Sequence, residues 1–215
     1  MALYALLDYD TLKKYNISIK DFCKTAKGLK AKILQYRDKN SSLEEKKQRL
    51  FEIKKHWNKT LIINDTVELM PYCDGIHIGQ EDLEGLCEKF SLSEYEVIQK
   101  LKTGRLTECV TKKNSFLVGL STHNKEEILK ANRLPLNYIG LGAYRHTRTK
   151  ETSNIIGKRV IELIKYSYHP VAVIGGVKIY DKIPSKLKVV GSDICKLTSS
   201  RLKKRKIIKG KSKSL

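Results

Sequence analysis

The chain has 215 residues, 40% of them hydrophobic, and a mean hydropathy of −0.40, which is enough for one domain with a sizeable buried core. Charged residues make up 31% of the chain, and no stretch approaches the roughly 18 consecutive apolar residues of a membrane span. Residues Met1 to Asp8 have no basic region and only a short apolar run, so we expect no export signal. These features exclude a disordered polymer and favour a soluble protein without a membrane partner.

Cysteine content and net charge indicate the cellular compartment and the kind of partner to expect. The five cysteines are an odd number without a C-x-x-C pair, a pattern typical of reduced thiols in the cytoplasm. There are 43 Lys and Arg against 23 Asp and Glu, for a net charge of +20, and nine basic residues follow Cys195 without an acid. Such a charge favours anionic partners, whether phosphorylated small molecules, nucleic acid or an acidic membrane surface.

Short apolar runs typical of buried strands recur along the chain. Between them lie helix starts, in which Ser18, Ser41 and Asn124 each stand three residues before an acid. Strands that alternate with helices over this length predict a single-domain (β/α)8 TIM barrel, with an open doubly wound sheet as the alternative. The eight predicted strands are Leu3–Leu7, Lys32–Tyr36, Thr60–Ile63, Gly75–Ile78, Phe116–Leu120, Tyr138–Leu141, Val171–Ile174 and Lys188–Cys195.

Two regions fit this alternation poorly. The connection after the fourth strand, from Asp82 to Ser121, is long enough for a helix and an added segment such as Ser93–Lys102. At the C-terminus the residues after Ser199 are too charged for a full closing helix, and we expect the chain to fray beyond Lys206. The predicted organisation is a barrel over residues 1–206 and a basic flexible tail over 207–215.

The second predicted strand changes character along one face. Side chains alternate along a strand, so Ile33, Gln35, Arg37 and Lys39 share a face that turns from apolar to amide, guanidinium and ammonium. In a barrel this end of the strand forms the mouth, where active sites are built. The gradient predicts an anion site there, while ordinary solvated charges on an edge strand are the alternative.

Carboxylates end the next two strands. Asn64 and Asp65 follow the third strand, and Asp82 follows the glycine turn after the fourth. A turn that caps the next helix would explain Asn64-Asp65 taken alone. Because neighbouring strands lie about 4.8 Å apart, the two acids can share one magnesium ion that also takes phosphate oxygens. Together with the basic strand they predict a metal-diphosphate site.

Later strand ends carry the groups that a phosphate cradle needs. Ser121 and His123 follow the fifth strand, although His123 can also be a structural histidine. Hydroxyls and bases follow the sixth strand in Thr147-Arg-Thr149-Lys150, and Gly175-Gly176 follows the seventh. Each signal is weak alone, but their occurrence at successive strand ends predicts binding of phosphorylated small molecules.

In this order the motifs resemble the thiamine-phosphate synthases, from Leu3 to about Ser199. That family has the (β/α)8 barrel and joins a hydroxymethylpyrimidine diphosphate to a thiazole phosphate, with magnesium and loss of pyrophosphate. The motifs that carry the resemblance are Gln35-x-Arg37-x-Lys39, Asn64-Asp65, Asp74-Gly-x-His77-x-Gly79-Gln80-x-Asp82, Gly119-x-Ser121-x-His123, Gly140-x-Gly142, Thr147-x-Thr149-Lys150 and Ile174-Gly-Gly176.

The resemblance implies a role for each matched residue. Asp65 and Asp82 would hold Mg²⁺, and the catalytic residues would be Arg37, Lys39, Ser121 and Lys150. The pyrimidine diphosphate would be held by Gln35, Arg37, Lys39, Asn64, Ser121 and Lys150. The thiazole phosphate would be received by Thr147, Thr149, Gly176, Thr198 and Ser199.

Departures from the family pattern leave alternatives open. Arg145-His146 replaces an aromatic-proline pair, and the segment Gly191–Ser199 matches the closing phosphate strand loosely. The alternatives are a thiazole tautomerase, an inactive phosphate-binding regulator on the same barrel, and a basic protein associated with nucleic acid. The metal acids favour the synthase over the tautomerase, and the lack of a base-reading module argues against specific nucleic-acid binding. A homo-oligomer is compatible with the sequence.

Overall fold

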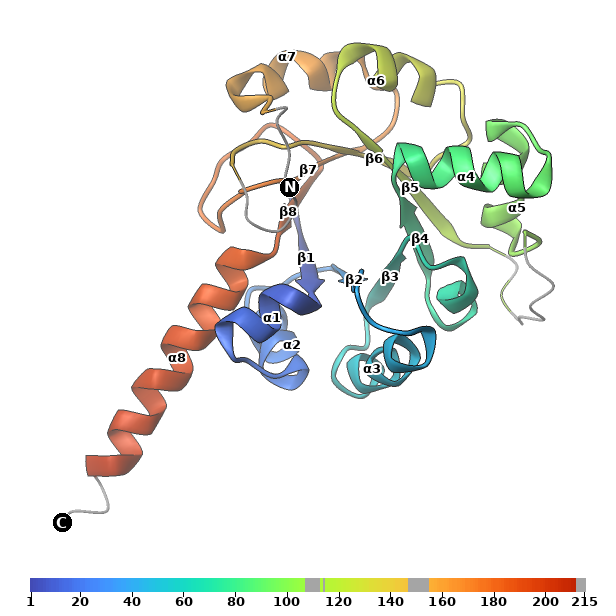
Figure 1. Cartoon of the computed structure of the whole chain (residues 1–215). Coiled ribbons are helices and arrows are strands. Elements are labelled where there is room, and N and C mark those ends of the chain that lie inside the picture. Colours follow the sequence, from blue (N-terminus) through green and yellow to red (C-terminus); the bar gives the residue numbers. More distant parts are fainter. Residues whose placement is uncertain (107–112, 114, 147–154, 212–215) are drawn as a thin grey trace.

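The computed structural model describes residues 1–106, 113, 115–146 and 155–211, with side chains through Lys204. Eight parallel strands follow one another around a closed barrel, and β1 pairs with β8 to close it (Figure 1). This confirms the predicted (β/α)8 barrel. The strands are β1 (Ala2–Asp8), β2 (Ile33–Arg37), β3 (Thr60–Asn64), β4 (Gly75–Ile78), β5 (Leu117–Thr122), β6 (Tyr138–Leu141), β7 (Val171–Val173) and β8 (Leu187–Val190).

Helices surround the strands, and α5 is the segment added to the long connection after β4. Its first turn is closed by a capping box, in which Ser93 and Glu96 each bond the other's backbone N–H. The α-helices are α1 (Tyr9–Tyr15), α2 (Ile19–Gly28), α3 (Leu43–His56), α4 (Gln80–Phe90), α5 (Glu94–Thr103), α6 (Lys125–Ala131), α7 (Val160–Leu163) and α8 (Ser192–Lys211). The short 3-10 turns are η1 (Val67–Tyr72), η2 (Gly157–Arg159) and η3 (Ile164–Tyr166).

The core has two layers because successive strand residues face opposite sides of the sheet. The outer layer packs the strands against the helices, with Leu34, Tyr36 and Ile63 among its fully buried side chains. The smaller inner layer fills the barrel with Tyr4, Leu6, Ile62, Tyr138, Ala172 and Val189. Residues that continue this inner face toward the carboxyl ends of the strands therefore reach the mouth of the barrel.

The C-terminal part differs from the sequence prediction. The last strand ends at Val190, and Ile194 and Cys195, expected on that strand, lie in the first turns of α8. The N–H groups of both turn back to the Gly191 carbonyl, at 2.9 and 3.2 Å, so their apolar side chains are buried by a helix. Helix α8 runs to Lys211, past the expected onset of fraying at Lys206, and its far part extends away from the barrel (Figure 1). Within the described residues no helix is long and apolar enough to cross a membrane.

Candidate active site

A cavity opens at the carboxyl ends of the strands, and side chains from most of the barrel line it. Many of the residues predicted to bind substrate or metal line this cavity. They come from the region between β2 and the end of β5 and from the glycine turn after β7. They are Gln35, Arg37, Lys39, Asn64, Asp65, Asp82, Ser121 and Gly176, and the same cavity is also lined by His77, His123, Gly175, Gly191 and Ser192. Thr147, Thr149 and Lys150 lie outside the described residues.

Asp65 and Asp82 form a carboxylate pair on one side of the cavity. Asp65 has a left-handed backbone, with φ of 57°, and its N–H donates to the His77 carbonyl at 2.9 Å. Asp82 lies in the first turn of α4 and accepts the N–H of Gly79 at 3.1 Å. Burial and, after it, the charge of the adjacent Asp82 raise the pKa of Asp65, and Lys39 opposes both effects, so that the resulting pKa is about 6.

This pair fits a divalent cation. The Asp65 and Asp82 side chains hydrogen-bond to each other, and Asn64 donates its amide N–H to Asp65. A hard cation binds carboxylate oxygens and would relieve the repulsion between two adjacent, partly buried acids. Within the described part of the chain no group of three or more His, Cys, Asp or Glu side chains is arranged around a metal position. A cation held by two protein carboxylates takes its other ligands from water or substrate, as Mg²⁺ usually does.

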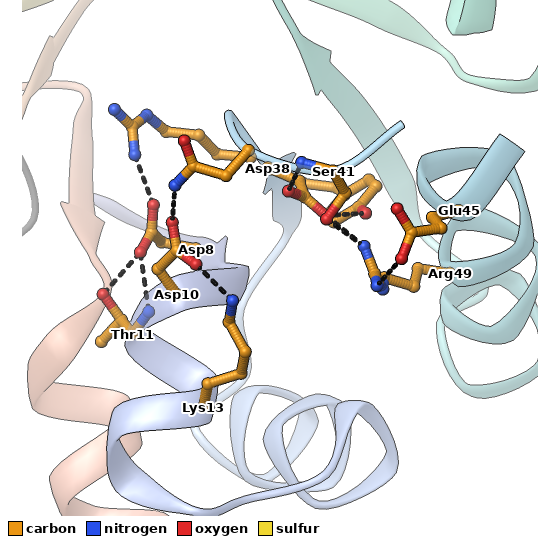
Figure 2. Close-up of polar contacts among 11 residues, drawn as sticks. Asp8, Asp10, Thr11, Lys13, Asp38, Ser41, Glu45 and Arg49 are labelled. Atoms are coloured by element: carbon orange, nitrogen blue, oxygen red, sulfur yellow. Dashed lines mark hydrogen bonds and ion pairs between the residues drawn. The ribbon is translucent and has the colours of Figure 1, made fainter. Parts of the chain in front are cut away.

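Arg37 reaches the cavity while its guanidinium is paired with Asp8 on the neighbouring strand. The two residues face each other in the β1–β2 register, and the side chains are 14% and 5% exposed. Asp8 also caps α1, accepting the backbone N–H and the hydroxyl of Thr11 at 2.9 and 2.6 Å (Figure 2). Sequence reasoning did not identify Asp8 because a register contact between strands has no local signal.

The loop that carries Lys39 is braced on both sides. Asn40 donates to Asp10 of α1 at 2.7 Å, and Asp38 turns the other way, toward α3 (Figure 2). Because Asp38 is buried and bonded to three groups, the backbone on either side of Lys39 has a defined course. The donors to Asp38, at 2.8 to 3.2 Å, are the Tyr36 hydroxyl, the Ser41 N–H and the Arg49 guanidinium.

Amide and hydroxyl groups line the wall between the acids and β5. Gln35 donates to the Asn64 side-chain oxygen at 3.2 Å, so the predicted amides of β2 and β3 form one unit. Gln80 donates to the Ser121 carbonyl at 2.6 Å and ties the start of α4 to the end of β5. The Ser121 hydroxyl lies 3.0 Å from Nε2 of His77, which faces the interior from β4.

The sequence did not predict a role for His77 or Tyr138, although His77 lies in the motif that runs from Asp74 to Asp82. The His77 and Tyr138 rings stack at 5.5 Å between centroids, and Nδ1 of His77 lies 3.1 Å from the Tyr138 hydroxyl. The inward alternation of Gly75-Ile-His77-Ile78 was the available signal for His77. His123, by contrast, bonds Glu127 in the first turn of α6 through both its ring Nδ1 and its backbone N–H, each at 2.9 Å.

The far side of the cavity consists of glycine turns and the start of α8. Gly175 and Gly176 have φ of 87° and 64°, and a Cβ on Gly176 would lie 2.8 Å from the Arg145 Cβ. The sequence predicted that Thr198 and Ser199 form a turn at the cavity, but the structure corrects this prediction. Both residues lie within α8, away from the cavity, and the Thr198 hydroxyl donates to the Ile194 carbonyl at 2.8 Å. Gly191 and Ser192 occupy the position expected for that turn.

The chain is similar in sequence to known proteins. The sequence model of the thiamine monophosphate synthase family matches residues 102–184. Thiamine-phosphate synthase of Dictyoglomus turgidum is 33% identical over 78% of this chain and 70% of its own length. Thiamine-phosphate synthase 1 of Aquifex aeolicus is 31% identical over 68% of this chain, and the match spans 62% of that relative, less than two thirds of its length.

Solved structures share the barrel. A thiamine phosphate pyrophosphorylase from Pyrococcus furiosus superposes with a TM-score of 0.65 over 92% of each chain, at 19% identity. A geranylgeranylglyceryl phosphate synthase from Thermoplasma acidophilum has a TM-score of 0.54 over 90% of this chain and 86% of its own, at 10% identity, a likeness of fold alone. With the relatives at 30% identity or more over most of the chain, this protein belongs to the thiamine-phosphate synthase family.

Proposed function

We propose that the protein is a thiamine-phosphate synthase, a transferase that joins hydroxymethylpyrimidine diphosphate to thiazole phosphate and releases pyrophosphate. The observation that carries the proposal is the pair Asp65 and Asp82 in the same cavity as Arg37 and Lys39. Family membership supports the same reaction. The oligomeric state and the cytoplasmic location stay predictions.

The diphosphate would bind on the side of the cavity formed by β2 to β5. Arg37 and Lys39 supply positive charge for its oxygens, and Lys150 is proposed to add a third cation. The linked amides of Gln35 and Asn64 would orient the substrate beside these charges, and Ser121 would contact it from β5. Ion pairing with Asp8 leaves the Arg37 guanidinium fixed in direction, which favours a defined contact over a mobile one.

Asp65 and Asp82 would hold Mg²⁺, which when bound neutralises charge on the leaving diphosphate. In the reaction the bond between the pyrimidine methylene carbon and the diphosphate oxygen breaks, and its electron pair leaves with pyrophosphate. The thiazole nitrogen then forms the new bond to that carbon. This chemistry needs positive charge around the leaving group and no protein nucleophile, which matches the basic side chains at the mouth.

The thiazole phosphate would bind at the opposite side, where loops after the last strands form the phosphate site of many such barrels. The backbone of Gly175 and Gly176, which lines the cavity together with Gly191 and Ser192 at the start of α8, supports this assignment. Thr147 and Thr149 stay predictions for this half of the site. Ser192 replaces the Thr198 and Ser199 hydroxyls expected from the sequence, because those lie farther along α8.

The direct test supplies the full chain with both substrates and measures thiamine phosphate and pyrophosphate, with Mg²⁺ and with EDTA. We expect equal amounts of both products, formed only with Mg²⁺. Absence of thiamine phosphate under conditions in which a known synthase is active would overturn the proposal. Conversion of a thiazole tautomer alone would favour the tautomerase, and phosphate binding without turnover would favour the inactive regulator.

Two variants separate the acid pair from general effects of charge. Asp82→Asn keeps an acceptor for the Gly79 N–H but removes the charge, and we expect a loss of about 10- to 150-fold in kcat/KM. Asp74→Asn is the matched control, since Asp74 precedes β4 at the opposite end of the barrel, where it accepts the Leu61 N–H at 2.8 Å. The control should keep the activity and magnesium dependence of the wild type.

A further inference from the structure

A chain of four side chains crosses the interior of the barrel from β1 to the cavity. The Tyr4 hydroxyl lies 2.9 Å from the Tyr138 hydroxyl, which lies 3.1 Å from Nδ1 of His77, whose Nε2 lies 3.0 Å from the Ser121 hydroxyl. Tyr4, Tyr138 and His77 are only 1%, 5% and 7% exposed. The chain therefore connects a buried phenol near the middle of the barrel with a hydroxyl that faces the substrate cavity.

The neighbouring strands make room for these rings by lacking side chains. Gly119 faces Tyr138 in the β5–β6 register, and a Cβ on it would lie 2.2 Å from the Tyr138 ring. A Cβ on Gly140 would lie 2.9 Å from Cε1 of His77. Because the stacked rings are enclosed in this way, the contacts along the chain are held by packing as well as by hydrogen bonds.

The number of protons on the two phenols and on His77 indicates which group donates in each hydrogen bond. Burial raises the pKa of both tyrosines, so both phenols are protonated at neutral pH. Among the described residues, Tyr138 is the hydrogen-bond partner of the Tyr4 hydroxyl. A proton on Nδ1 of His77 would leave three protons for the two contacts Tyr4–Tyr138 and Tyr138–His77, so one buried donor of this chain would have no acceptor within the described part of the molecule. The arrangement that uses every proton has Tyr4 donating to Tyr138 and Tyr138 donating to Nδ1.

We propose that Tyr4, Tyr138 and His77 are positioning residues that set the Ser121 hydroxyl as a hydrogen-bond donor toward the bound substrate. With Nδ1 occupied as an acceptor, the ring proton is on Nε2 and is donated to the Ser121 oxygen. The Ser121 proton then points away from His77, toward an acceptor atom of the substrate in the cavity. The identity of that substrate rests on the proposed function, whereas the direction of the hydrogen bonds does not.

The first test reads the proton position directly. Long-range ¹H–¹⁵N spectra of the ¹⁵N-labelled full chain at neutral pH distinguish the Nε2–H tautomer from the Nδ1–H tautomer, and His77→Gln identifies the His77 signals. We expect the Nε2–H tautomer in the wild type and a shift toward Nδ1–H in Tyr138→Phe, which removes the donor to Nδ1. An Nδ1–H or doubly protonated His77 in the wild type would overturn the inference.

The second test uses variants in which an amide group reproduces either the Nε2 or the Nδ1 position of His77. The glutamine amide nitrogen reaches the position of Nε2, so His77→Gln should keep kcat/KM within about threefold, because the hydrogen bond to Ser121 survives. Asparagine reaches only the Nδ1 position, and His77→Asn should lose about tenfold, the value of one hydrogen bond. Tyr138→Phe should lose about three- to tenfold, while Tyr168→Phe, on an 86% exposed tyrosine, is the neutral control.

The two tests separate this inference from the proposed function. Equal activity of His77→Asn and His77→Gln, with both variants folded by circular dichroism, would show that the Nε2 contact does not matter and would overturn the inference. A wild-type chain without synthase activity would overturn the proposed function. In that case the tautomer of His77 alone decides between the two hydrogen-bond directions.

Discussion

Arg37, which is proposed to bind the substrate, also contributes to the fold because its guanidinium pairs with the buried Asp8 carboxylate. Among the described residues, Arg37→Met leaves that carboxylate in the interior with only the Thr11 donors, which is costly for a buried charge. We expect the free energy of unfolding, measured in urea, to fall by about 3 kcal/mol. A loss of activity in this variant would therefore mix weaker substrate binding with lower stability.

The double variant Asp8→Asn with Arg37→Met removes this ambiguity. Asparagine still caps α1 but carries no charge, so most of the lost stability should return. The loss of kcat/KM, about 10- to 150-fold for one charge-assisted contact, should stay. Equal stability of the single and double variants would show that Asp8 does not depend on Arg37.

The conformation of the connection from β2 to α3 depends on the ion pair between Asp38 and Arg49. Burial by itself would raise the pKa of Asp38, but hydrogen bonds from Tyr36, Ser41 and Arg49 lower it below its usual value. A carboxyl with a lowered folded pKa stabilises the protein above its unfolded pKa and loses that contribution as the pH falls through the folded pKa. Protonation of Asp38 should therefore loosen the loop that carries Lys39 only in acid.

Asp38→Asn tests this assignment. Near neutral pH the variant should be less stable than the wild type by about 1.5 to 3 kcal/mol, the range for hydrogen bonds to a charged group. The difference should begin to shrink as the pH falls below about 4, near the unfolded pKa, and should continue to shrink as the pH falls through the lower folded pKa, where the wild-type carboxyl becomes neutral. Denaturant titrations between pH 3 and pH 7 measure it, and a gap that is independent of pH would contradict the role of the charge.

The interior of the barrel has room for the Tyr138 ring because Gly119 on the neighbouring strand has no side chain. Gly119→Ala would push a Cβ to 2.2 Å from the Tyr138 ring, so β5, β6 or the ring must move, and we expect about 3 kcal/mol or more of lost stability. Gly85→Ala is the matched control, since nothing lies within 4 Å of the added Cβ in α4. The control should be neutral or gain up to about 1 kcal/mol, because alanine favours helix. Similar melting temperatures for both variants would contradict this account of the interior.

The basic end of α8 is predicted to be dispensable for the reaction. The helix packs on α1 and α2 near its start, where Ile194 and Cys195 are fully buried, whereas Arg201, Lys203 and Lys204 are exposed. A chain cut after Lys206 should keep its synthase rate and melting temperature at moderate salt. It should also lose much of any salt-sensitive adhesion to DNA or RNA, which scales with the phosphates neutralised. A drop in melting temperature would show that residues 207–211 contribute to the fold.

Features of the fold that depend on a local pattern of residues could be predicted before the structure was known. The strand and helix signals predicted the barrel because hydrophobic periodicity and helix caps act within a few residues. The period of two along Ile33-Leu-Gln35-Tyr-Arg37 correctly predicted which side chains face the cavity, and parallel strands bring their carboxyl ends to one mouth, as Asp65 and Asp82 show. The added helix α5 was likewise visible in its Ser93 cap.

Contacts between strands that are distant in the sequence could not be predicted in this way. The pairing of Arg37 with Asp8 and the chain from Tyr4 through Tyr138 and His77 depend on strand register, which no local signal reports. The apolar segment after Gly191 reads equally well as a strand or a buried helix, and packing on α1 and α2 decides for the helix. Because this segment is a helix, Thr198 and Ser199 lie beyond its first turn and do not line the cavity. Gly191 and Ser192, at the start of the helix, line the cavity instead.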